Sequence, residues 1–149
     1  MTLEIKSFQQ LTTNELYEVL QLRSEVFVVE QECVYQDIDG NDLNAIHLLG
    51  KQGKQVVAYA RILKAGTYFK EVAIGRVVVQ QAARKKGWAQ KIMIAALKYI
   101  KDEMQETKVT LSAQTYLIQF YESLGFKTVG AEYLEDGIPH IQMQYSSTP

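Results

Sequence analysis

In parts of the chain apolar residues recur every three to four positions, and this spacing indicates helices. Thr12 and Glu15 form the capping box that begins many helices, and Gly125 is the kind of residue that ends one. Helices are therefore expected over 13–29, 87–104 and 116–124. The second of these has the clearest apolar stripe, with its lysines on the opposite side.

Shorter apolar runs rich in β-branched residues indicate strands between the helices. Gly50 and Gly53 lie where a hairpin turn would make two neighbouring strands antiparallel. The strand, helix and strand from 73 to 113 form a crossover, which makes those two strands parallel. The expected strands are 3–8, 46–49, 56–63, 73–79, 109–113, 127–129 and 141–145.

This order of elements predicts an α+β fold. We expect a single domain over 1–149, built on a central, mixed, largely antiparallel twisted sheet with helices on both faces. The continuous run Val77–Val79 is typical of a central strand that is covered on both sides. The polar segment 30–44 has no sustained period, so it is either a wall of a substrate pocket or a plain connection.

Composition is that of an ordinary globular protein, with 47% hydrophobic residues and a formal net charge of −1. This charge gives no general attraction to nucleic acid or to an anionic membrane, and no apolar run approaches the roughly 20 residues of a membrane-spanning helix. We therefore expect a cytoplasmic protein that binds neither. Cys33 is the single cysteine, which rules out an internal disulfide, and we interpret it as a plain thiol.

The segment from Val77 to Ala89 carries the most chemical information. A strand end passes through the basic residues Arg84, Lys85 and Lys86 into a helix start at Gly87. Free N–H groups in a first helical turn and the positive end of the helix dipole attract phosphate. The segment therefore indicates an anion site, with a solvated basic loop as the alternative.

The same segment, Arg84-Lys85-Lys86-Gly87-Trp88-Ala89, resembles the Gln/Arg-x-x-Gly-x-Gly/Ala signature of the GCN5-related N-acetyltransferase (GNAT) superfamily, which holds a pyrophosphate. Leu111–Gln114 and Phe120–Phe126 resemble the downstream strand and helix of that superfamily. A narrower resemblance to its ElaA-like branch covers nearly the whole chain, through Val28–Gln31, Tyr35–Gly40, Ala58–Arg61 and Glu135–His140. The resemblance implies acetyl-coenzyme A as donor and a small-molecule or peptide amine as acceptor. It leaves open which amine is used and whether the chain is a homodimer.

The resemblance also implies contacts with coenzyme A by position. The backbone of Val77, Val78 and Val79 would pair with the pantetheine arm as a further strand does. Arg84 to Ala89, including Lys85, Lys86, Gly87 and Trp88, would hold the pyrophosphate. Phe120, Tyr121 and Gln114 complete the expected contacts, although Gln114 stands where many members have asparagine, so that its contact is left open.

Tyr121 corresponds to the tyrosine that protonates the departing thiolate in many superfamily members. A phenol of pKa about 10 is able to protonate a thiolate of pKa about 8.5 as the thiolate leaves. The alternative is that Tyr121 packs in the core.

The base that deprotonates the acceptor amine is open between two residues. His140 precedes the last expected strand, and histidine side chains titrate near neutral pH, while Glu30 ends the first expected helix. A structural histidine and a helix-capping carboxylate are the plainer interpretations. Arg61, Arg76, Gln31 and His140 are candidates for acceptor binding, and the two arginines could equally form internal ion pairs with Asp37, Asp39 or Glu30.

No metal is expected, because His47, His140 and Cys33 lack the short paired spacings of a zinc site. The predicted function is direct acetyl transfer to a primary amine without a covalent enzyme intermediate. The alternative from another class is a non-catalytic module that binds coenzyme A or an acyl-coenzyme A.

Overall fold

The computed structural model describes residues 2–147 and joins seven strands in one sheet. The strands are β1 (Thr2–Ser7), β2 (Ile46–Gln52), β3 (Gln55–Leu63), β4 (Val72–Val79), β5 (Lys108–Gln114), β6 (Lys127–Glu135) and β7 (Ile138–Ser146). Their order is β1-β2-β3-β4-β5-β7-β6, and β4 with β5 is the one parallel pair among these neighbours. The predicted mixed, largely antiparallel sheet is confirmed.

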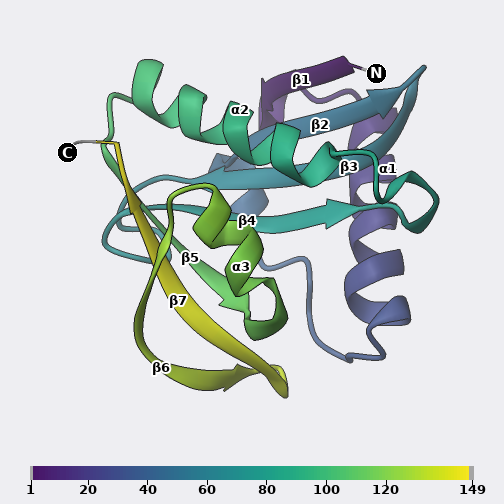
Figure 1. The fold of residues 1–149 in the computed structure, drawn as a ribbon. Coiled ribbons are helices and arrows are strands. Elements are labelled where there is room, and N and C mark those ends of the chain that lie inside the picture. Colours follow the sequence, from purple (N-terminus) through teal and green to yellow (C-terminus); the bar gives the residue numbers. More distant parts are fainter. Residues whose placement is uncertain (1, 148–149) are drawn as a thin grey trace.

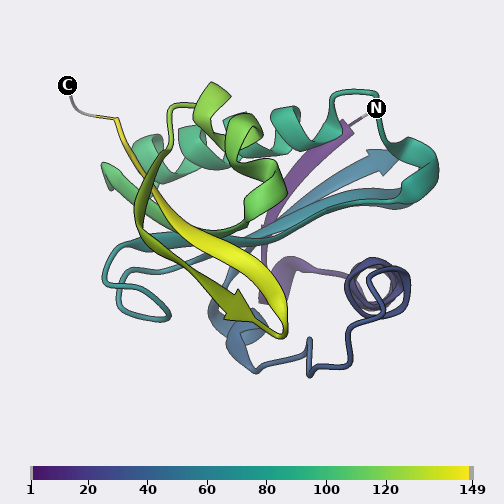
Figure 2. The ribbon, with the colours of Figure 1, turned by 60° about the horizontal axis from the view of Figure 1, so that its bottom comes forward.

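Helices cover both faces of this sheet, as predicted. One face carries α1 (Thr13–Arg23), while α2 (Trp88–Asp102) and α3 (Ile118–Ser123) lie on the other (Figure 1, Figure 2). The buried side chains accordingly form a large apolar cluster beneath α2 and α3 and a smaller one beneath α1. Thr12 and Glu15 form the predicted capping box, which fixes the start of α1.

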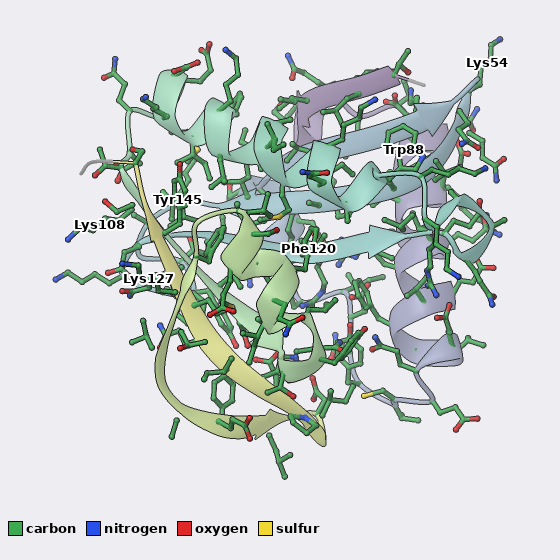
Figure 3. All side chains as sticks on the ribbon, in the orientation of Figure 1. Lys54, Trp88, Lys108, Phe120, Lys127 and Tyr145 are labelled. Carbon is green, nitrogen blue, oxygen red and sulfur yellow. The ribbon has the colours of Figure 1, made fainter. Side chains whose placement is uncertain are left out.

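Trp88, labelled in Figure 3, joins the start of α2 to the sheet. Its side chain is buried in the larger cluster, and a Cβ atom added to Gly50 on β2 would lie 2.6 Å from the indole ring. The glycine therefore allows the close approach of the helix start to the strand. This contact holds the segment that precedes α2 in a fixed place.

The expected helix over 13–29 is only partly right, because its second half is a π-helix over Ser24–Glu30. The amide of Gln31 donates to the carbonyl of Val26, five residues back, at 3.2 Å. Apolar spacing does not distinguish this wider helix from an α-helix, so the π-helix could not be predicted from the apolar pattern. Short 3₁₀ turns lie at Phe8–Gln10, Asn41–Asn44, Gln81–Ala83 and Thr115–Leu117.

The strand expected over 127–129 is also longer, since β6 continues to Glu135. Its residues are almost all exposed, so that no alternation of buried and exposed side chains marks it. The extension places Glu135 and His140 on a β-hairpin rather than on a loop. Within residues 2–147, no helix combines the length and the apolar character needed to cross a bilayer.

Candidate active site

The two parallel strands in the middle of the sheet separate soon after they begin. In the described chain their pairing is limited to Val72 with Val109 and Ala73 with Thr110, after which β4 and β5 diverge (Figure 1). The edge of β4 from Ile74 to Val79 therefore has no strand beside it on this side. Unpaired backbone N–H and C=O groups at such an edge are able to bind an extended ligand.

A β-bulge lies in β4 at this opening. Tyr59 pairs with Val78 and Arg61 pairs with Gly75, so that Arg76 and Val77 together oppose Ala60. Arg76 has a φ of 51°, which is an uncommon backbone conformation for a residue with a side chain. The bulge turns the backbone of residues 76–77 out of the regular ladder with β3.

A cavity of about 380 Å³ opens between the separated strands. Segment 30–44 forms one wall, the segment between β3 and β4 forms another, and the β6–β7 hairpin closes the far side. The cavity brings together these predicted site residues: Gln31, Arg61, Arg76, Val77, Gln114, Tyr121 and His140. The interpretation of segment 30–44 as a pocket wall is thus the one that the structure supports.

Tyr121 comes from α3 and lines the cavity with most of its side chain buried. Phe120 packs edge-on against it, with ring centroids 5.1 Å apart. Burial raises the pKa of the Tyr121 phenol above its ordinary value, and nearby Tyr116 acts in the same direction. The hydroxyl therefore keeps its proton at neutral pH, as a proton donor requires.

The basic loop Arg84–Ala89, where the sequence indicates an anion site, follows the end of β4 and leads into α2. Lys85 and Lys86 are exposed, and Gly87 begins the helix with a φ of 83°. Within the described chain no side chain caps this helix start, so that its first N–H groups have no capping partner. The Trp88 side chain is buried in the core, which leaves only its backbone available to a ligand.

Arg84 and Glu30 form a two-pronged ion pair beside this loop, with N–O distances of 2.7 and 2.9 Å. The Arg84 side chain also donates to the carbonyl oxygen of Val79 at 3.1 Å. The hydrogen bond from Arg84 lowers the pKa of the Glu30 carboxyl. Glu30 is not among the residues that line the cavity. Both facts make it a weaker candidate for the base than His140.

Arg61 and Arg76 belong to an ion-pair network that fastens segment 30–44 to the sheet. Arg61 binds Asp39 at 2.6 Å and Asp42 at 3.0 Å, while Arg76 binds Asp37 at 2.7 Å. The fully buried Arg23 of α1 completes the network through Asp37 and Asp42. The internal ion pair is therefore the alternative that the geometry favours for both arginines.

His140 forms part of a polar cluster that sequence reasoning missed. Its Nδ1 lies 2.7 Å from the carbonyl oxygen of Ile138, and its Nε2 lies 3.5 Å from a carboxylate oxygen of Glu135. Ser112 and Tyr68 donate to the other oxygen of Glu135 at 3.3 and 3.4 Å. Tyr133 stacks on the His140 ring and hydrogen-bonds Ser112.

One sequence signal could have found this cluster. Asp136 and Gly137 form the Asp-Gly pair that favours a two-residue hairpin turn. Reading them as a turn would have extended the preceding strand and paired it with the last one. The residues on either side, Glu135 and Ile138, would then have faced each other, as the strand register has them.

Comparisons with known proteins agree with this architecture. The family model described as "Acetyltransferase (GNAT) domain" matches residues 9–147. Protein ElaA of Escherichia coli strain K12 is 47% identical over 136 residues, which cover 90% of this chain and 89% of ElaA. A UPF0039 protein of Schizosaccharomyces pombe is 43% identical over 141 residues, with 93% of each chain covered.

Solved structures give the same result. The crystal structure described as an acyl-CoA N-acyltransferase from Pseudomonas aeruginosa has a TM-score of 0.91 and 43% identity, covering 98% of this chain and 100% of that one. Family model, sequence relatives and structure thus converge on one assignment. The chain belongs to the GNAT acetyltransferase family, in its ElaA-like branch.

Proposed function

We propose that this protein transfers an acetyl group from acetyl-coenzyme A directly to a primary amine. The observation that carries the proposal is the separation of β4 and β5 beside a cavity, with an uncapped helix start at one end. An extended thioester needs an unpaired strand edge along its arm and N–H groups at its phosphates. Both lie here in the order that the arm and the pyrophosphate have in coenzyme A.

The donor would lie along β4. The backbone of Val77 and Val79 would pair with the pantetheine arm, and the N–H groups of Arg84 to Ala89 would hold the pyrophosphate, with Lys85 and Lys86 adding positive charge. Because the Arg84 side chain binds Glu30 and its N–H donates to the Gln81 carbonyl at 3.3 Å, the phosphates would be held chiefly by the N–H groups of Lys85 to Ala89. The thioester carbonyl would then lie at the bulge of residues 76–77, where backbone N–H groups would stabilise the developing oxyanion.

Tyr121 and His140 would move the protons. The amine nitrogen attacks the thioester carbon, the C–S bond breaks, and the Tyr121 hydroxyl protonates the departing thiolate. The Nδ1 of His140 contacts the Ile138 carbonyl, so that the Nε2 of the neutral ring would accept a proton from the amine. The proton that His140 accepts would return to the Tyr121 oxygen, and the ammonium form of the acceptor would release its other proton to solvent. The products are an amide, coenzyme A as a thiol, and that one proton.

Calorimetric titration tests the donor site. Acetyl-coenzyme A and dephospho-coenzyme A, which both contain the pyrophosphate, are expected to bind with micromolar affinity, and pantetheine, which lacks it, at least tenfold more weakly. Equal affinity for pantetheine would remove the role of the Arg84–Ala89 loop. No binding of acetyl-coenzyme A at millimolar concentration would contradict the proposed function.

A further inference from the structure

The charges around the cavity differ sharply between its two sides. In the described chain, Arg61 and Arg76 are the cationic residues that line it, and both are already bound to aspartates. The network that holds them contains three arginines and three aspartates, so that its charges balance. The Nε atom of Arg61 has no partner within residues 2–147, but it is buried and exposes no surface to a ligand.

The opposite side of the cavity carries a carboxylate without such a partner. Among the ion pairs of the described residues, Glu135 has no lysine or arginine, and its one basic partner is His140 at 3.5 Å. Ser112 and Tyr68 donate only long, neutral hydrogen bonds to it. The exposed Asp136 follows directly at the turn and adds negative charge. This side of the cavity is therefore suited to a cation.

The His140 ring gives a second reason to expect a cation on this side of the cavity. A carbonyl oxygen only accepts hydrogen bonds, so the Nδ1 that lies 2.7 Å from the Ile138 carbonyl must carry a proton. In the neutral ring, Nε2 is then an acceptor, and it faces the Glu135 carboxylate, which is also an acceptor. Two acceptors this close repel each other unless a proton on Nε2 or a donor group of a ligand that bridges them satisfies both. An ammonium group satisfies both, since it donates several hydrogen bonds.

Aromatic rings lie next to the same carboxylate. Tyr68 reaches Glu135 with its hydroxyl, and its ring meets Phe69 edge-on with centroids 4.8 Å apart. Both rings line the cavity, and the Tyr68 side chain is largely exposed there. Such a wall accommodates an apolar or aromatic body attached to a cation.

We propose that the acceptor is a primary amine on an apolar or aromatic body, held as an ammonium ion by Glu135, whose amine-bearing carbon carries no carboxylate. This inference rests on the proposed function, because it names the acceptor of that reaction. A carboxylate beside the amine, as in an α-amino acid, would lie against Glu135 without a free cation to bind it. Amino acids are therefore expected to be rejected.

Phenethylamine and L-phenylalanine test this directly, because they share one ring and differ by the carboxylate. Each is titrated into the wild-type protein, with and without coenzyme A. Phenethylamine is expected to bind at least tenfold more tightly in both series. Equal or tighter binding of phenylalanine, or no binding of phenethylamine at millimolar concentration, would overturn the proposal. This comparison needs no variant.

Glu135→Gln then tests the residue. It keeps the size and the acceptor oxygen of the side chain and removes the charge, so that phenethylamine affinity is expected to fall about tenfold. Glu132→Gln removes the same charge from an exposed position of β6 outside the cavity and is expected to change nothing. Equal affinities in the two variants would contradict the role of Glu135.

Turnover separates this inference from the proposed function. Binding of phenethylamine without acetyl transfer from acetyl-coenzyme A would leave the cation site standing and refute the transferase activity. Acetyl transfer to both ligands at the same kcat/KM would leave the activity standing and refute the acceptor class. The two proposals therefore fail in different experiments.

Discussion

At the scale of single residues, the proposed acetyl transfer depends on a phenol that holds its proton. Tyr121 is buried beside the opening between β4 and β5, and the hydrogen bonds within the described chain include none to its hydroxyl. Within residues 2–147, no hydrogen-bond partner thus competes with a departing thiolate for that proton. Its raised pKa fits an acid that acts only as the sulfur leaves.

Tyr121→Phe is therefore expected to lower kcat by roughly 10² to 10⁴ and to leave the Kd for acetyl-coenzyme A unchanged. Steady-state kinetics and calorimetric titration measure the two quantities. Tyr17→Phe removes an exposed hydroxyl from α1 and serves as the matched control. A Tyr121→Phe enzyme with unchanged kcat would show that Tyr121 only packs in the core.

At the scale of elements, the ion-pair network holds the cavity wall in place. Segment 30–44 has little regular structure, yet Asp37, Asp39 and Asp42 fasten it to arginines of α1, β3 and β4. Arg23 is the fully buried member and contacts two of the aspartates. Paired charges thus hold this wall of the pocket in place.

Arg23→Ala is expected to lower the free energy of unfolding by roughly 3–5 kcal/mol, because it leaves Asp37 and Asp42 buried without this partner. Urea denaturation measures the loss. Lys98→Ala breaks an exposed pair with Asp102 on α2 and is expected to cost about 0.5 kcal/mol or less. Similar losses in the two variants would show that the network contributes little to stability.

Glu15 ties α1 to two strands and makes stability depend on pH. Burial raises the pKa of its carboxyl, but hydrogen bonds from Lys51 and Lys6 and from the Thr12 amide outweigh burial and lower the pKa to about 2. The group is thus more acidic in the folded state. Its stabilisation is complete above the unfolded pKa of about 4.3 and is lost as pH falls towards 2.

The difference in unfolding free energy between wild type and Glu15→Gln is therefore expected to be larger at pH 6 than at pH 3. Denaturation curves at the two pH values measure it. A difference that stays constant, or grows as the solution is acidified, would contradict the lowered pKa of Glu15.

At the scale of the whole molecule, the order of strands and helices could be predicted because each has its own apolar period. Thr12 and Glu15 marked a helix start, and the crossover from 73 to 113 fixed the parallel pair. The bulge at Arg76 could not be predicted, since Gly75-Arg76-Val77 resembles any buried strand. It becomes visible only in the register with β3, where two residues oppose Ala60.

The site was only partly predictable for a related reason. Tyr121 and the Arg84–Ala89 loop lie in local motifs, and a motif is visible in the sequence. The pairing of Arg61 with Asp39, and of Glu135 with His140, arises only when separate strands and loops come together. Residue types alone left those partners open, which is why the two arginines had two interpretations.

The most direct test is the crystal structure of the protein with coenzyme A. We expect the pantetheine arm to lie between β4 and β5, paired with the backbone of Val77 and Val79. The pyrophosphate is expected on the N–H groups of Lys85 to Ala89, and the sulfur beside Tyr121. Coenzyme A bound outside this opening, or with its sulfur away from the cavity that Tyr121 and His140 line, would contradict this expectation.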